Sequence, residues 1–193
     1  YYDEGRSLAM SSLDFVKDSV FYVDSPKLVF LHYFYTHHPY LFTRDGRDLE
    51  KKDKELLNSK EGYLETLEFT SKKILDLTNY ILKNSKKEPI IILISDHGVY
   101  LNFLKNERYF SGDRRLLGSS VSPRNLAVFN LPSGGEVILY DNMSNVNIFR
   151  SIFNYYFNSN FEKLDDRAFI LDDLNKEYLD VTEQVNYMWE KQF

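Results

Sequence analysis

The stretch Pro89-Ile90-Ile91-Ile92-Leu93-Ile94-Ser95-Asp96-His97-Gly98 decides the predicted fold, because an unbroken apolar run stops there on an acid, an imidazole and a glycine. Five consecutive apolar residues without alternation predict a strand that is buried on both faces, as in a parallel sheet covered by helices. Ligands of open α/β sheets bind beyond the carboxyl ends of the strands. The chemistry is therefore expected at Asp96 and His97.

The adjacent carboxylate and imidazole of Asp96 and His97 are both ligands for divalent metal ions. A turn that aims the two side chains at one point creates half of a metal site, and Gly98 gives this turn conformational freedom. The alternative is a structural role. In that case Asp96 caps the next segment and His97 is a hydrogen-bonded histidine at the sheet edge.

Composition sets limits on the class of protein. The chain has 193 residues, of which 43% are hydrophobic and 27% are charged, and this size and balance predict one globular domain over residues 1–193. A net charge of −5 argues against a nucleic-acid-binding surface. The absence of cysteine excludes disulfides and thiolate metal sites. No apolar stretch approaches the roughly 20 residues of a membrane span.

A second strand is predicted at residues 28–34, which are apolar except for His32 and run into Tyr35-Thr36-His37-His38-Pro39-Tyr40. Proline cannot continue a central strand, so His37 and His38 are expected in the loop at its tip. Their side chains point in different directions in any extended backbone, and only one of them is expected to face a given site. His32 is interpreted as a buried, hydrogen-bonded histidine rather than a ligand.

A long amphipathic helix is predicted at residues 62–83, with Leu64, Leu67, Ile74, Leu75, Ile81 and Leu82 on its apolar stripe. The order strand 28–34, helix, strand 90–95 is a β-α-β unit, whose strands are almost always parallel. Both carboxyl ends then lie on one sheet edge. This arrangement would bring His37 close to Asp96 and His97.

The remaining segments are interpreted as scaffold. A peripheral helix is predicted at residues 7–20, a charged surface loop with a short helix at 43–60, and strands at 126–131 and 137–140. Ser144 is a predicted N-cap for the helix that follows it, and a further strand is expected at 178–181. The helical spacing of the aromatic residues favours core packing over a ligand-binding platform.

These stretches resemble a known family. The resemblance rests on residues 28–40 (LVFLHYFYTHHPY), the long helix that opens at Gly62-Tyr63-Leu64, the Ser95-Asp96-His97-Gly98 turn, and the runs 124–132, 145–150 and 154–157. They are similar to the C-terminal half of the sulfatase-like proteins of the alkaline phosphatase superfamily. Relatives there include lipoteichoic acid synthases and lipid A phosphoethanolamine transferases, and the most similar branch is bacterial and often membrane-anchored. The similarity runs from about Lys27 to Arg167.

The resemblance implies site residues. Asp96 and His97 would bind a divalent metal ion, zinc or manganese, with calcium or magnesium as alternatives. His37 would act as a catalytic residue on the transferred phosphate or sulfate group, and His38 and Arg124 would contact the substrate, although Arg124 could equally pair with an acid. The family's nucleophile and first acidic ligand come from an N-terminal half, for which there is no room before Leu28. Many relatives also have a further histidine after the turn, and residues 99–115 contain none.

The predicted fold is therefore α/β, a mostly parallel β-sheet flanked by helices, equivalent to the C-terminal part of an alkaline-phosphatase-like domain. The predicted function is metal-dependent hydrolysis or transfer of phosphate or sulfate esters of cell-envelope glycans or lipids, with the chain alone inactive. The alternative is a non-catalytic binding or assembly domain. Expected partners are the missing N-terminal half or a second copy bound through exposed apolar surface, and the parent protein is expected to be extracytoplasmic or membrane-anchored.

Overall fold

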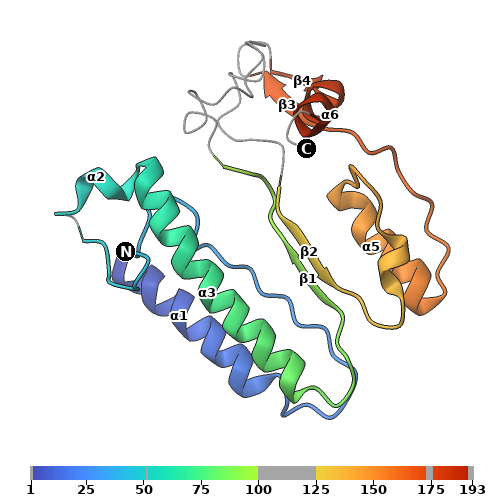
Figure 1. Cartoon of the computed structure of the whole chain (residues 1–193), viewed down its shortest axis with the longest axis horizontal. Helices are drawn as coiled ribbons and strands as arrows, with labels where there is room; N and C mark the ends of the chain where they lie inside the picture. Colours follow the sequence, from blue (N-terminus) through green and yellow to red (C-terminus); the bar gives the residue numbers. More distant parts are fainter. Residues whose placement is uncertain (1, 51, 100–124, 173–175, 191–193) are drawn as a thin grey trace. The chain divides into compact units, whose positions relative to one another are not determined.

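The computed structural model describes residues 2–50, 52–99, 125–172 and 176–190. The chain divides into two compact units, residues 1–89 (the first unit) and residues 90–193 (the second unit). Figure 1 shows their elements in chain order, namely α1 (Tyr2–Ser19), α2 (Lys54–Leu57), α3 (Lys60–Asn84), β1 (Ile91–Ile94), β2 (Ala127–Asn130), η2 (Gly135–Ile138), α5 (Asn145–Phe157), β3 (Phe169–Asp172), β4 (Glu177–Asp180) and α6 (Thr182–Glu190).

In the first unit, α1 packs against α3 through narrow apolar stripes. Leu13 and Val16 lie three residues apart, on one face of α1, and are buried against Leu77 of α3. The predicted helices at residues 7–20 and 62–83 are thus confirmed. The predicted stripe of α3 is partly wrong, because Leu64 and Leu75 are exposed. The buried residues of α3 are Gly62, Thr66, Phe69, Thr70 and Leu77.

The segment of residues 28–34 is extended, and it lies against these helices on one face only. Leu31 and Tyr33 pack on the cluster that α1 and α3 form, whereas Leu28 and Phe30 are 88% and 84% exposed. Figure 1 draws this segment as a blue trace without an arrow. From Phe30 to Phe34 the side chains therefore alternate between solvent and helix, which the run of consecutive apolar residues did not indicate.

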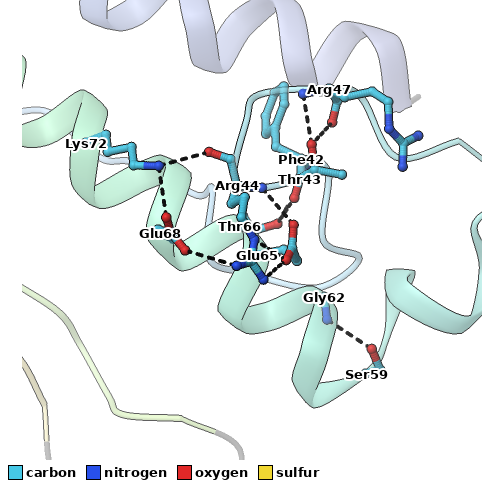
Figure 2. Close-up of polar contacts among 10 residues, drawn as sticks. All are labelled: Phe42, Thr43, Arg44, Arg47, Ser59, Gly62, Glu65, Thr66, Glu68 and Lys72. Carbon is cyan, nitrogen blue, oxygen red and sulfur yellow. Dashed lines mark hydrogen bonds and ion pairs between the residues drawn. The ribbon is translucent and has the colours of Figure 1, made fainter.

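The loop that follows this segment is fastened to α3 by polar contacts, which Figure 2 shows. The buried hydroxyl of Thr66 donates a 2.7 Å hydrogen bond to the carbonyl oxygen of Phe42. The carboxylate of Glu65, the residue before Thr66, accepts hydrogen bonds from the backbone and the guanidinium of Arg44. Lys72, which pairs with Glu68 of its own helix at 2.9 Å, also donates to the carbonyl oxygen of Arg44 at 3.4 Å. The loop is thereby held over an aromatic cluster of Tyr35, Phe42 and Phe69.

The described part of the second unit contains two antiparallel strand pairs. β1 and β2 are antiparallel, with Ile91 opposite Asn130 and Ile94 opposite Ala127. β3 and β4 are also antiparallel, with Phe169 opposite Asp180. The strands predicted near residues 126–131 and 178–181 are confirmed. The strand predicted at 137–140 is wrong, since η2 ends at Ile138 and the next two residues belong to no strand.

The N-terminal end of α5 is organised around one carboxylate, that of Asp166. Ser144 precedes the helix as predicted, but its side chain makes no capping hydrogen bond. Its hydroxyl instead donates to Asp166 Oδ1 at 2.6 Å, and the side chain of the fully buried Asn147 donates to the same oxygen at 2.8 Å. The segment after α5 is thereby tied back to the start of the helix.

The predicted α/β fold is wrong for the described part of the chain. Its strands form two two-stranded antiparallel sheets, and no parallel pair is present among them. Two physical reasons account for the error. First, residues 28–34 contact the helices on one face only and pair with no strand among the described residues. Second, β1 pairs with β2 in the antiparallel direction, so these described strands form no β-α-β crossover.

Candidate functional site

The predicted metal-binding turn lies directly after β1, in the second unit. Ser95 continues the ladder by one residue, because its N–H donates to the carbonyl oxygen of Leu126 at 3.0 Å. The next side chains leave the ladder for solvent. The side chain of Asp96 is 84% exposed and that of His97 is 40% exposed, so both are accessible to an ion or a small anion.

The imidazole of His97 is held in one tautomer by its own turn. Its Nδ1 lies 2.8 Å from the carbonyl oxygen of Gly98, and a carbonyl oxygen can only accept a hydrogen bond. Nδ1 therefore carries the proton, and the lone pair of the neutral ring is on Nε2. Metal-binding histidines commonly donate their second ring N–H to a carbonyl or carboxylate in this way, because it fixes the ring and its tautomer.

Asp96 and His97 face each other across a gap suited to an ion. His97 Nε2 lies 3.8 Å from Asp96 Oδ2, which is too long for a hydrogen bond. The other carboxylate oxygen, Oδ1, accepts a 3.0 Å hydrogen bond from the backbone N–H of His97. Zinc binds imidazole nitrogen and carboxylate oxygen at about 2.0–2.2 Å, so ligand atoms up to roughly 4 Å apart can share one ion. The pair fits a metal ion as two ligands.

A third ligand is not supplied nearby by the described residues. No group of three or more acidic or histidine side chains in a metal-binding arrangement occurs within residues 2–50, 52–99, 125–172 and 176–190. The choice among zinc, manganese, calcium and magnesium stays a prediction. One nitrogen and one oxygen donor suit zinc or manganese better than calcium, which prefers oxygen alone.

His37 has the same local design in the first unit. Its side chain is exposed, and its Nδ1 lies 2.5 Å from the carbonyl oxygen of His38, so the lone pair of the neutral ring is again on Nε2. The rings of His37 and His38 are stacked, with centroids 4.6 Å apart. The two adjacent side chains thus share one side of the loop, contrary to the prediction that they point in different directions. His32 is exposed between Phe30 and Phe34, so its predicted burial is wrong.

The predicted site residues fall in different parts of the chain. His37 and His38 belong to the first unit, and Asp96 and His97 belong to the second. Arg124 lies outside the described residues. The shared edge of a parallel sheet, which was the reason to expect His37 beside Asp96, is absent from the described residues. That His37, Asp96 and His97 face one cleft therefore stays a prediction, and the predicted parallel sheet no longer supports it.

Two asparagines next to the turn were not recognised in the sequence. Asn125 Nδ2 lies 2.7 Å from the carbonyl oxygen of Ser95, and Asn145 Nδ2 lies 3.0 Å from the same oxygen. Each asparagine stands at the start of a predicted element, before the strand at 126–131 and after the N-cap Ser144. That position was a signal for a capping or anchoring side chain.

Comparison with family models, with curated proteins and with solved structures finds no match to this chain. The resemblance to the sulfatase-like proteins therefore stays a prediction that rests on the motif residues alone. In the described part of the chain, no helix is both long enough and apolar enough to cross a membrane.

Proposed function

We propose that this chain contributes to metal-dependent hydrolysis or transfer of phosphate or sulfate esters, with Asp96 and His97 as metal ligands. The observation that carries the proposal is the His97 ring, whose Nδ1–H donates to the Gly98 carbonyl and whose Nε2 lone pair lies 3.8 Å from the Asp96 carboxylate. Fixing the tautomer of an exposed histidine adds little to the stability of the fold. Fixing the tautomer of a metal-binding histidine increases its affinity for the metal ion, because the ring is already oriented.

A metal ion bound there would polarise an ester oxygen and lower the pKa of a hydroxyl nucleophile. The protein's own side chains have simpler roles in the proposal. Asp96 and His97 hold the ion, and the backbone of Gly98 holds the ring of His97. His37 contacts the phosphate or sulfate group. A proton on its Nε2 would allow it to donate to the developing charge or to the departing oxygen.

His38 and Arg124 are proposed as substrate contacts. The stacked arrangement of His37 and His38 supports the first of these, since two exposed imidazoles on one side of a loop can both donate to an anion when protonated. No residue is assigned as nucleophile. Without one, turnover by this chain is expected to be marginal, because covalent catalysis contributes several orders of magnitude in rate.

The experiment is a titration of the purified chain with Zn²⁺ and with Mn²⁺ by calorimetry. Two protein ligands hold an ion weakly, so we expect weak binding that is abolished in Asp96→Ala and in His97→Ala. His32→Ala is the matched control, because His32 is also exposed but belongs to neither the proposed metal site nor the proposed substrate contacts. Unchanged binding in both turn variants would remove these residues from the metal site.

The substrate side is tested separately with chromogenic phosphate monoesters, phosphate diesters and sulfate esters in the presence of each metal ion. Any turnover above background is expected to fall in His37→Ala. If robust turnover persists in that variant, His37 has no catalytic role. If robust turnover is lost in it, the chain holds a more complete site than we propose.

A second candidate function, non-catalytic assembly, is favoured by one observation. Leu28, Phe30 and Phe34 project from an extended segment and are largely exposed, at 88%, 84% and 61%. No backbone hydrogen bond to another strand is made by residues 28–34 in the part of the chain that the structure describes. Extended segments of this kind pair readily with strands of other chains. We propose a second copy of the chain as the partner.

A further inference from the structure

Ser95, the residue before the proposed metal ligands, uses all of its polar groups in hydrogen bonds. Its N–H donates to Leu126 O at 3.0 Å, and its Oγ accepts from Leu126 N at 2.8 Å. Its carbonyl oxygen accepts two side-chain hydrogen bonds, from Asn125 at 2.7 Å and from Asn145 at 3.0 Å. A carbonyl oxygen has two lone pairs, so this one is saturated.

The two asparagines also bind each other. Asn125 Nδ2 lies 2.7 Å from Asn145 Oδ1, so the two N–H groups of one amide serve both Ser95 and the second asparagine. Asn125 directly precedes the hydrogen-bonded end of β2, and Asn145 is the first residue of α5. The carbonyl oxygen at the end of β1 is thereby fixed from two other elements of the same unit.

A fixed Ser95 carbonyl constrains the residue that follows. The carbonyl oxygen of Ser95 and the N–H of Asp96 belong to one planar peptide group, so the direction in which the chain leaves β1 is set. Beyond that plane, the hydrogen bonds of the turn among the described residues are its own, from His97 N–H to Asp96 Oδ1 and from His97 Nδ1 to Gly98 O. The asparagine pair thus anchors the turn to two other elements of the second unit.

We propose that Asn125 and Asn145 are positioning residues, which hold the Asp96–His97 pair in its ligand-ready arrangement through the Ser95 carbonyl. The effect on metal binding rests on the proposed function. The effect on the tautomer and orientation of the His97 ring does not depend on that function, because it can be measured without a metal ion.

Two variants separate positioning from general stability. Asn125→Ala removes the amide that serves both Ser95 and Asn145. Asn145→Asp replaces the donor to Ser95 with a charged acceptor, while its carboxylate can still accept from Asn125 and is favourable at the first turn of a helix. Asn145→Asp is therefore expected to keep α5 folded even if Asn125→Ala unfolds the second unit. The control is Asn154→Ala, since Asn154 anchors Phe161 in the same unit by two hydrogen bonds and does not contact the turn.

The first measurement is long-range ¹H–¹⁵N NMR of the histidine rings without metal. We expect His97 in the wild type to be the Nδ1–H tautomer, and both anchor variants to show a mixture of tautomers. Asn154→Ala is expected to lower the thermal midpoint but to leave the His97 signals unchanged. Wild-type His97 signals in both anchor variants, or an equal change in Asn154→Ala, would overturn the positioning role.

The second measurement is Zn²⁺ affinity by calorimetry. Loss of an outer partner of a metal-binding histidine typically weakens binding by about 10- to 100-fold, and we expect a decrease of that size in Asn125→Ala and Asn145→Asp. If the wild type binds no zinc but the NMR signals change as expected, the proposed metal site is refuted and the positioning role of the two asparagines is supported. If zinc binds equally to all variants, the positioning role is refuted and the metal site is supported.

Discussion

The hydroxyl of Ser144 donates a 2.6 Å hydrogen bond to Oδ1 of Asp166, twenty-two residues later in the chain. The same oxygen accepts from the Ser144 N–H and from Asn147, and Oδ2 accepts from Tyr140. Burial by itself would raise the pKa of Asp166, but these hydrogen bonds outweigh it and hold the pKa below its usual value. Asp166 thus connects the segment after η2, the start of α5 and the segment that leads to β3.

Asp166→Ala is expected to lower the free energy of unfolding of the second unit by about 1–3 kcal/mol, since it leaves several half-buried donors without an acceptor. Urea denaturation followed by circular dichroism measures this change. Asp165→Ala is the matched control, because Asp165 is an exposed neighbour of the same type. Equal stabilities of the two variants would contradict the anchoring role.

The carboxyl group of Asp180 is expected to have a pKa well below its usual value. Hydrogen bonds from the hydroxyl and N–H of Thr182, followed by those from Arg167, lower its pKa to about 2. A folded-state pKa below the unfolded one gives stability that is present above the unfolded value of about 3.9 and is lost as the pH falls towards 2. Carboxyl ¹³C NMR should show this low midpoint.

Thr182→Val and Arg167→Ala should both raise the midpoint of Asp180, because each removes a side-chain hydrogen bond that lowers its pKa. Arg150→Ala serves as the control, since Arg150 contacts the backbone of Glu162 instead. A wild-type midpoint near 3.9 would show that these contacts do not persist in solution.

Gly62→Ala is expected to destabilise the first unit, although alanine is favoured over glycine in a helix by about 1 kcal/mol. A Cβ on Gly62 would lie 1.8 Å from the carbonyl oxygen of Leu56, so backbone must move, and overpacking costs about 1–3 kcal/mol or more. Ser71→Ala, at an exposed position of the same helix, should be neutral or slightly stabilising. Thermal unfolding distinguishes the two, and a more stable Gly62→Ala would refute the close approach.

Self-association is expected to depend on residues 28–34. An antiparallel pair of copies centred on Leu31 would place Leu28 opposite Phe34 and Phe30 opposite His32. Burial of these apolar side chains from both copies would cover on the order of 1,000 Å², near the lower limit of a specific interface. The segment is therefore long enough to support a weak dimer.

Sedimentation velocity should show a concentration-dependent dimer that Phe30→Lys abolishes. Phe15→Lys, at a similarly exposed aromatic residue of α1, should leave the dimer intact. Equal loss in both variants would indicate nonspecific apolar association. A wild type that stays monomeric would exclude the second copy as the partner of this segment.

The sequence by itself determined the local features of this protein. Spacing and capping residues predicted α1, α3 and α5, and the apolar run ending at Ser95 predicted β1 with the Asp96–His97 turn at its end. These features depend on neighbours within a few residues. The hydrogen bond that sets the tautomer of His97 is of the same kind, because it joins adjacent residues.

Only the tertiary structure decided what those elements pack against. The apolar sequence of residues 28–34 does not reveal that one face of the segment packs against nothing in the described structure. The apolar sequence of β1 does not reveal that its partner strand is antiparallel. The anchors of Ser95 lie thirty and fifty residues away from it. Contacts over such separations depend on how whole helices and strands pack together. The hydrophobic pattern within one helix or strand does not specify which other element it packs against.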